Sequence, residues 1–141
     1  MLKGQIGKMC FSRIFEDEDL AEAVKKRVEE SGIKAGIFIL IGSLKKAILG
    51  YYKEGQYKSI ELGGPLEIAS CMGNIAVNEK GEIVIHSHIV VSNEKGKALG
   101  GHLMKGSPVG ATAELVIVEG ARVNLQRTFD EKTRLNLWKL G

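Results

Sequence analysis

The three histidines of this 141-residue chain are the residues best suited to do chemistry together. His86 and His88 lie one residue apart in a β-branched run, and side chains two residues apart on a strand point to the same face. His102 follows after one further turn segment. Three neutral imidazoles on one patch can share a divalent metal, and zinc sites with three protein ligands commonly keep a fourth position for water or substrate.

Two copies of the tetrapeptide Asn-Glu-Lys-Gly, at Asn78–Gly81 and Asn93–Gly96, indicate how the histidines are positioned. Each copy separates two β-branched runs, and Asn-x-x-Gly is typical of a type I turn followed by a left-handed glycine. The two turns therefore predict a three-stranded meander with strands at Met72–Val77, Glu82–Ser92 and Lys97–Met104.

The same turns predict the register of the meander. If the residues that flank each turn close its hairpin, His88 lies directly opposite His102, and Asn74 lies opposite His86. We therefore predict a metal site formed by His86, His88 and His102, with Asn74 beside it. Zinc is the preferred ion, although imidazole also suits nickel, copper and iron. The competing interpretation is three cross-strand histidines at a polar or subunit surface.

Two more side chains are candidates for catalytic roles near such a metal. Glu67 lies in an apolar context, where it could be a general base, a fourth ligand or a partner of a ligating imidazole, or simply a solvated strand residue. Arg13 could bind an anionic substrate through its guanidinium, or pair with the acidic run Glu16–Asp19. The Gly100-Gly101 pair before His102 indicates a close backbone approach, a bulge or a bend in the sheet.

One helix is predicted at Asp17–Ser31, in a chain whose length suits a single domain over residues 1–141. The helix prediction depends on an acidic first turn, an apolar stripe at helical spacing and Gly32 as its C-terminal cap. Gly42-Ser43 is expected to break a strand, and Gly63-Gly64-Pro65 to form a turn. Further strands are predicted at Gln5–Ile14, Ile33–Ile41, Ala47–Tyr52, Tyr57–Leu62 and Ala111–Val118.

Composition excludes several classes of protein. The longest apolar run, Ala35–Ile41, is far shorter than the about 20 residues that span a bilayer. The first residues lack the apolar segment of a secretory signal, and Cys10 and Cys71 are expected to be free thiols, so we expect a cytoplasmic protein. The formal net charge of +3 is too small to indicate nucleic-acid binding by itself.

Five short motifs together resemble the plants-and-prokaryotes-conserved (PPC) domain, in a stand-alone prokaryotic form. They are Gly64-Pro65-Leu66-Glu67, Gly73-Asn74-Ile75-Ala76, His86-Ser87-His88, Gly100-Gly101-His102-Leu103 and the following Gly106. The resemblance covers most of the chain and extends back to the segment from Arg13 to Leu20. It implies an α/β (α+β) fold with a largely antiparallel twisted sheet and a few helices, a trimeric assembly, and a metal site at the three histidines.

The resemblance leaves the function open. Plant relatives join this domain to AT-hooks, but neither proline of this chain follows Gly-Arg, so DNA affinity would depend on other cations. One hypothesis is a trimeric metal-binding protein with a regulatory or assembly role and weak DNA binding. The other is a zinc enzyme acting on a small carbonyl or carboxylate substrate, similar in its histidines to acetolactate decarboxylase. A third interpretation is a structural zinc that only stiffens a trimer. The candidate phosphate-binding residues are Lys25, Lys26, Arg27, Lys45, Lys46, Arg122, Arg127, Lys132 and Arg134.

Overall fold

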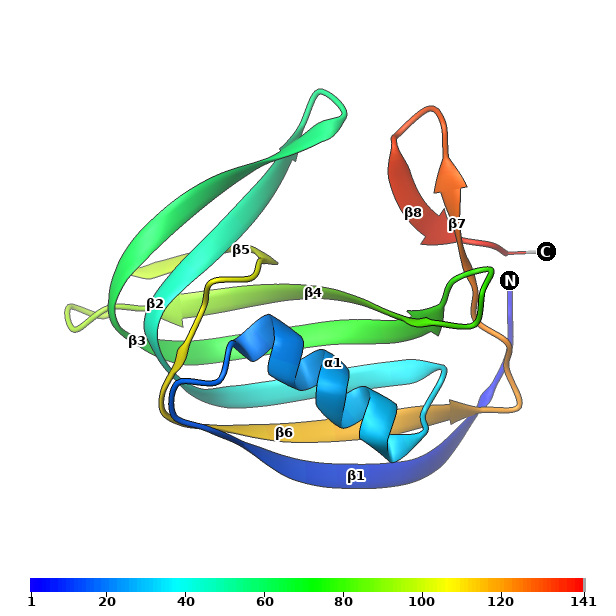
Figure 1. The fold of residues 1–141 in the computed structure, drawn as a ribbon, viewed down its shortest axis with the longest axis horizontal. Coiled ribbons are helices and arrows are strands. Elements are labelled where there is room, and N and C mark those ends of the chain that lie inside the picture. The colour runs from blue at the N-terminus through cyan, green and yellow to red at the C-terminus, as the bar shows by residue number, and fades with distance from the viewer. Residues whose placement is uncertain (141) are drawn as a thin grey trace.

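A long, bent antiparallel sheet with one helix against one of its faces forms the body of the protein (Figure 1). The structure is a computed structural model that describes residues 1–140. Its elements are β1 (Gln5–Phe15), α1 (Leu20–Ser31), β2 (Gly36–Lys53), β3 (Gln56–Val77), β4 (Ile83–Ser92), β5 (Ala98–Leu103), β6 (Val109–Ala121), β7 (Arg127–Asp130) and β8 (Leu135–Trp138). The main sheet has the strand order β1-β6-β2-β3-β4-β5, and β7 pairs with β8 in a separate hairpin. The predicted fold class is confirmed.

The helix begins later than the sequence predicted, because Asp19 is its N-cap. The Asp19 carboxylate accepts a hydrogen bond from the backbone N–H of Glu22 at 3.1 Å, which satisfies a donor that the first turn leaves free. Asp17 lies outside the helix in a left-handed conformation, with φ of 68°. Gly32 closes the helix with φ of 71°, as predicted, and its N–H donates to the Glu29 carbonyl oxygen.

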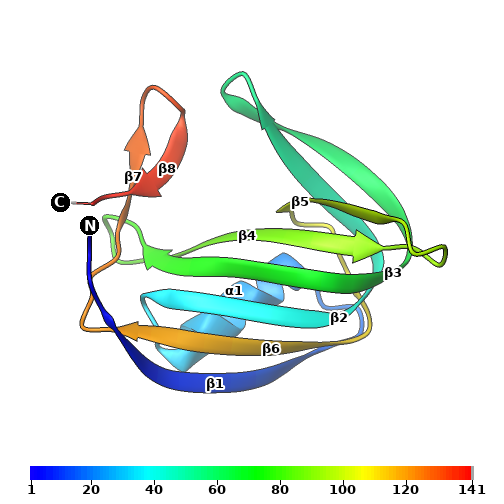
Figure 2. The same ribbon diagram turned by 180° about the vertical axis from the view of Figure 1, so that it is seen from behind.

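The predicted apolar stripe of the helix packs onto one face of the sheet and is buried there. Alternate residues of the central strands point to the same side, so a single core lies between α1 and the sheet. The opposite face is left uncovered, and Figure 2 turns that face toward the viewer. The largest fully buried side chains include Ile14, Leu20, Val24, Val28, Phe38, Ile75, Ile89, Leu115 and Ile117.

Two expected chain breaks are bends within long strands instead. Gly42-Ser43 does not end β2, and Gly63-Gly64-Pro65 lies inside β3 rather than in a turn. The register of the β2–β3 pair shifts at both places, which is the mark of a β-bulge. A side chain at Gly42 would overlap the Thr112 carbonyl oxygen, and one at Gly64 would overlap that of Lys45. These glycines therefore allow neighbouring backbones to meet closely where the sheet bends.

Beyond the bends, β2 and β3 continue as a two-stranded arm, residues 46–63, that projects from the body (Figure 1). The hairpin of β7 and β8, here called the C-terminal hairpin, projects on the same side. The Tyr52 hydroxyl of the arm donates to the Thr133 carbonyl oxygen of the hairpin at 2.6 Å. The two projections rise from opposite ends of β4, and this bond joins them above it.

The C-terminal hairpin was not predicted from the sequence. Its turn is closed by Asp130, whose carboxylate accepts bonds from the Thr133 N–H at 2.8 Å and the Thr133 hydroxyl at 2.6 Å. Such an Asp-to-Thr spacing between runs that alternate apolar and polar residues was the available signal. Within residues 1–140, no helix is both long enough and apolar enough to cross a membrane.

Candidate functional site

The predicted register of the meander is confirmed at every position that concerns the histidines. His88 is paired with His102 across β4 and β5, and Asn74 is paired with His86 across β3 and β4. The turns are responsible: the Asn93 side chain accepts bonds from the backbone N–H groups two and four residues later, and Asn78 does the same. The glycines at the ends of both turns are left-handed, with φ of 80° and 73°.

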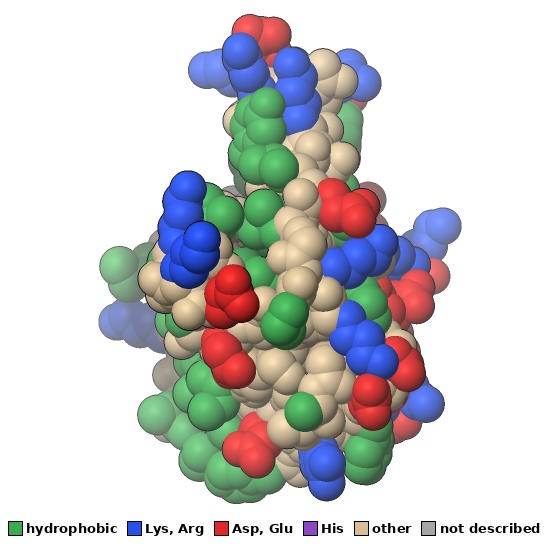
Figure 3. Space-filling view, turned by 90° about the vertical axis from the view of Figure 1, so that its left-hand side faces the viewer, with side chains coloured by type: hydrophobic (Ala, Val, Ile, Leu, Met, Phe, Trp, Pro, Cys, Tyr) green, Lys and Arg blue, Asp and Glu red, His purple; other side chains and the backbone are tan. Residues whose placement is uncertain are grey.

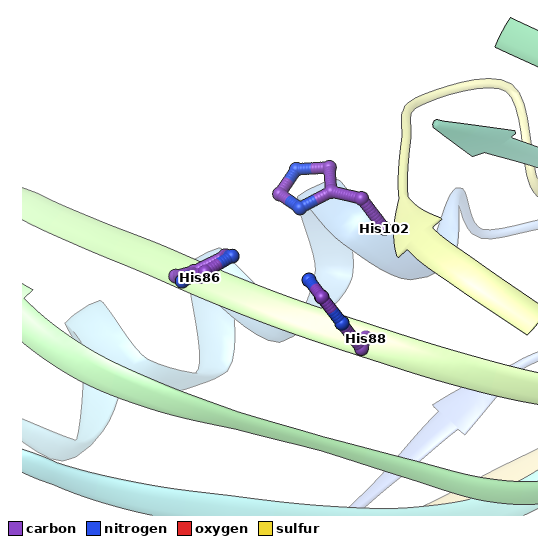
Figure 4. Close-up of side chains that lie close together, drawn as sticks. All are labelled: His86, His88 and His102. Atoms are coloured by element: carbon purple, nitrogen blue, oxygen red, sulfur yellow. The ribbon is translucent and has the colours of Figure 1, made fainter. Parts of the chain in front are cut away.

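The three imidazole rings converge above β4, on the face of the sheet that α1 does not cover (Figure 4). Their ring centroids are 5.1 Å apart for His86 and His88, 5.3 Å for His86 and His102, and 5.7 Å for His88 and His102. One nitrogen from each ring lies within 4.8 Å of the other two. Within residues 1–140, these three residues form the group able to hold a metal ion.

This donor set fits a divalent metal. Zinc binds imidazole nitrogens at about 2.0–2.1 Å in a tetrahedral arrangement, and three neutral histidines are a common ligand set for it. The Nδ1 atom of His102 is buried and has no hydrogen-bond partner. A buried imidazole nitrogen without a partner is costly, and a bound cation relieves that cost.

The protonation state of the site also suits a metal. Burial, followed by the charges of His86 and His88, lowers the pKa of His102 to about 4. Burial is also the main reason that the pKa of His86 is lowered, with Arg127 and His88 adding to the effect. Both rings are therefore neutral at pH 7, which is the form that ligates metals.

A buried arginine, Arg127 of β7, lies directly beside the histidines. Only 7% of its surface is exposed, so the sequence-based assignment of Arg127 to a phosphate-binding surface is wrong. Its Nη2 donates to the Asn74 side-chain oxygen at 2.7 Å and lies 3.5 Å from His86 Nδ1, and its Nη1 donates to the Asn136 carbonyl oxygen. The guanidinium also lies 5.7 Å from the centroid of the Trp138 ring. Asn74, predicted to accompany the histidines, therefore orients Arg127.

The arm contributes Tyr57, another residue that the sequence did not single out. Its ring centroid is 4.6 Å from that of His102, with the two planes tilted by 34°. Tyr52 packs edge-on against Tyr57, with centroids 5.9 Å apart. The sequence shows that tyrosines are frequent in this segment. It does not indicate contact with the histidines, which lie far away along the chain.

The glycines beside His102 permit a close backbone approach. β5 pairs with β2 at two positions, one of which joins His102 to Gly50. A Cβ atom at Gly101 would lie 2.8 Å from the Gly50 carbonyl oxygen, closer than such atoms come in proteins. Of the three interpretations of Gly100-Gly101, close approach is confirmed, and the β4–β5 pairing is regular across both glycines.

A cavity of about 530 Å³ separates the histidines from the C-terminal hairpin. His86 and His102 line the cavity together with Tyr57 of the arm. The C-terminal hairpin contributes Arg127, Arg134 and Trp138. A second hollow of about 380 Å³ lies next to His86 and His88, over Ile37 and Ile39 of the uncovered sheet face.

The structure does not bring Glu67 or Arg13 to the histidines within one chain. Glu67 is exposed and pairs with Ser92, four residues along β4 from His88. Arg13 lies on β1, at the far edge of the sheet, where its Nε donates to the Thr112 hydroxyl at 3.0 Å. Its guanidinium lies over the Phe15 ring rather than against the acidic run.

Residues 1–121 match a family model described as the Plants and Prokaryotes Conserved (PCC) domain. Two solved structures share the fold over 99% of this chain: a metal-containing protein from Archaeoglobus fulgidus and a plant- and prokaryote-conserved (PPC) protein from Pyrococcus horikoshii. The first is 30% identical with a TM-score of 0.88 and is covered over 99% of its length; the second is 31% identical with a TM-score of 0.89 and is covered over 98%.

A third structure, a candidate DNA-binding protein from Bacteroides thetaiotaomicron, shares the fold at 23% identity and a TM-score of 0.84, over 98% of both chains. Among curated proteins, the bifunctional protein GlmU from Synechococcus is 28% identical over 123 residues, which are 86% of this chain and 18% of GlmU. The chain therefore spans about a fifth of the length of the curated relatives that it matches.

Proposed function

The chain belongs to the Plants and Prokaryotes Conserved domain family, and from that premise we propose that it is a metal-binding protein whose ion is held by His86, His88 and His102. Zinc is the proposed ion, because it accepts imidazole nitrogens and has no strict geometric demand. A homotrimer is the proposed assembly.

The observation that carries the proposal is the convergence of three imidazoles whose ligand atoms lie within 4.8 Å of one another. A relative that is 30% identical over almost its whole length is a metal-containing protein, which supports the same conclusion for this chain. Structural zinc sites are normally closed by four protein ligands, whereas this group offers three among residues 1–140. The proposed site therefore keeps one coordination position for water or a ligand.

Elemental analysis of the purified protein tests this proposal. We expect about one metal ion per chain, with zinc the predominant element. His88→Ala should remove nearly all of it, because it deletes one of the three ligands. His88 is the most exposed of the three, so this substitution should disturb the fold least. Val90→Ala is the matched control, since Val90 is the next exposed residue on the same face of β4. Equal metal content in both variants, or none in the unaltered protein, would contradict the proposal.

The uncovered face of the sheet supports assembly with other copies of the chain. Phe11, Ile37, Ile39, Ile41 and Met72 lie on this face, and each is between 49% and 73% exposed. β2 and β3 are neighbours in the sheet, and β6 lies between β2 and β1. Val116 of β6 is paired with both Ile39 and Phe11, so apolar side chains continue across this face. An apolar patch of this kind marks an interaction site. We propose that a trimer buries it.

Weak DNA binding in a regulatory role is included in the proposal because a structural neighbour is a candidate DNA-binding protein. The charges limit its strength: Arg27, Lys45 and Lys46 pair with carboxylates. Acidic and basic side chains also intermingle on the face of the molecule in Figure 3. We expect a mobility shift at low salt that is lost at about 150 mM salt. Absence of a shift at low salt would remove DNA from the proposal.

We also propose a cytoplasmic location, since both thiols are free. Burial raises the pKa of the Cys71 thiol to about 12, which keeps it unreactive. Cell fractionation with an antibody against the chain tests the location, and recovery with secreted proteins would contradict it.

The cavity beside the histidines favours a second candidate function, a metalloenzyme acting on a small carbonyl or carboxylate substrate. Bound at the three histidines, a metal ion would polarise a carbonyl or activate water. Within one chain, Glu67 and Arg13 do not line this cavity. A screen of 2-keto and 2-hydroxy acids with metal-loaded protein tests it. Turnover that His88→Ala abolishes would support it, and no turnover with any compound would exclude this class of substrate.

A further inference from the structure

The cavity between the histidines and the C-terminal hairpin has an unbalanced charge. Its lining contains Arg127 and Arg134 together with His86 and His102, and none of its twelve lining residues, all within the described chain, is acidic. Most of the remaining wall is apolar and includes Trp138 and Leu137. Its volume of about 530 Å³ lies within the range of about 300–1,000 Å³ that is typical of small-molecule sites.

Arg127 is the strongest source of this imbalance. It is more than nine-tenths buried, yet its two hydrogen-bond acceptors, the Asn74 side-chain oxygen and the Asn136 carbonyl oxygen, are both neutral. The ion pairs found among residues 1–140 all involve other cations. Its Nε–H is buried and has no partner at all. A buried guanidinium without a counter-charge is costly, and an anion at the cavity would offset that cost.

We propose that this cavity binds a small organic monocarboxylate with an apolar body. The carboxylate lies against Arg127, which lines the cavity and whose Nε–H has no partner within the described chain. A planar guanidinium is the side-chain group best matched to a carboxylate. The body of the ligand packs against Trp138 and Leu137. One buried guanidinium matches one negative charge, which favours a monocarboxylate over phosphate. The proposal rests on the proposed function, because the histidine-bound metal forms one side of the same cavity.

Arg134 has a different role from Arg127. It is exposed, lies in the turn of the C-terminal hairpin, and adjoins the tip of the arm near Gly55. A solvated guanidinium contributes little to affinity because water and salt screen it, although it attracts anions toward the opening. The carboxylate specificity of the cavity therefore depends on Arg127, which lies within 3.5 Å of a proposed metal ligand.

The chain contains a single tryptophan, and it lies in the cavity wall. The fluorescence of Trp138 is therefore a direct reporter of ligand entry. We would titrate the full-length, metal-loaded protein with phenylacetate, with its neutral analogue phenylacetamide, and with inorganic phosphate. Phenylacetate should give a saturable change, and phenylacetamide should bind at least about tenfold more weakly, because it cannot compensate the buried charge.

Variants then identify the residue responsible. Arg127→Gln should weaken phenylacetate binding at least about tenfold and reduce the preference over phenylacetamide, whereas Arg134→Gln should change it less than threefold at moderate salt. Arg127→Lys keeps the charge without the planar fork and should be intermediate. Circular dichroism shows whether each variant is folded. The comparison of the two phenyl compounds in the unaltered protein stands even if both Arg127 variants unfold.

The outcomes separate this inference from the proposed function. Metal content is measured on the same samples, so a protein that binds zinc but not phenylacetate overturns the inference and leaves the metal site standing. If the purified protein contains no metal and still binds phenylacetate, with the same affinity after chelator treatment, the metal site is contradicted and the Arg127 pocket is supported. Equal affinity for the acid and its amide, or binding of phosphate without binding of phenylacetate, overturns the monocarboxylate assignment.

Discussion

Arg127 Nη2 donates a 2.7 Å hydrogen bond to the side-chain oxygen of Asn74, and this bond joins two parts of the chain that are 53 residues apart. Asn74 belongs to the segment that the family model matches, whereas Arg127 lies beyond its end at residue 121. The bond therefore fastens the C-terminal hairpin to the strand beside His86. It completes the cavity that the histidines alone would leave open on one side.

Asn74→Ala should loosen the C-terminal hairpin, because it removes the side-chain oxygen that accepts the 2.7 Å hydrogen bond from Arg127 Nη2. We expect the free energy of unfolding to fall by about 1–3 kcal/mol, measured by urea denaturation. Hydrogen exchange should speed up in β7 and β8 while metal content is unchanged. Asn124→Ala, at an exposed site, is the control and should lie within about 0.5 kcal/mol of the unaltered protein.

Acid should destabilise the metal-free protein through His102. Its pKa is about 4 when folded, against an ordinary value of 6.5, because burial disfavours the charged ring. The unfolded chain therefore binds the proton more readily, so the stabilising contribution of neutral His102 is complete above about pH 6.5 and is lost as the pH falls to about 4. The urea midpoint after chelation should decline across this range and decline less in His102→Asn. Identical pH dependences would contradict the prediction.

Gly73→Ala should disturb the core beneath the histidines. A Cβ atom there would lie 2.5 Å from both the His86 carbonyl oxygen and the Phe38 ring. The carbonyl belongs to the backbone of β4, and the Phe38 ring is fully buried, so neither can move freely. We expect a loss of about 1–3 kcal/mol in the free energy of unfolding. Gly63→Ala is the matched control on the same strand, since nothing lies within 4 Å of a Cβ atom at that position. A similar loss in both variants would show that crowding is not the cause.

Ile39→Asp should break the proposed trimer, because Ile39 lies in the middle of the uncovered apolar face and is 49% exposed. Light scattering should give the mass of three chains for the unaltered protein and one chain for the variant. Leu99→Asp is the control, since Leu99 is 43% exposed but points to the other face of the sheet, opposite Val91. A single-chain mass for the unaltered protein would refute the trimer.

The histidine cluster could be predicted from the sequence because its geometry depends on short-range interactions. Asn93 accepts hydrogen bonds from groups no more than four residues away, and these bonds set which residues of β4 and β5 are paired. The helix was predicted for a similar reason, since its apolar stripe and its C-terminal cap at Gly32 are local patterns, although it begins at Leu20 rather than Asp17. Such interactions involve residues that are close together in the sequence, so they can be predicted without knowledge of the rest of the fold.

The cavity, by contrast, was decided by tertiary structure alone. Gly63-Gly64-Pro65 looks like a turn locally, but pairing of β3 with β2 carries the strand through it and sends the arm outward to place Tyr57 beside His102. Arg127 looks like a surface cation in a basic tail, yet it is buried because the hairpin folds back onto residues 41 and 53 positions earlier in the chain. The sequence by itself determined which histidines meet, through turn hydrogen bonds only a few residues long. The charged and aromatic side chains that surround the histidines were decided by packing between distant segments. The free energy of such packing cannot be inferred from a local sequence pattern.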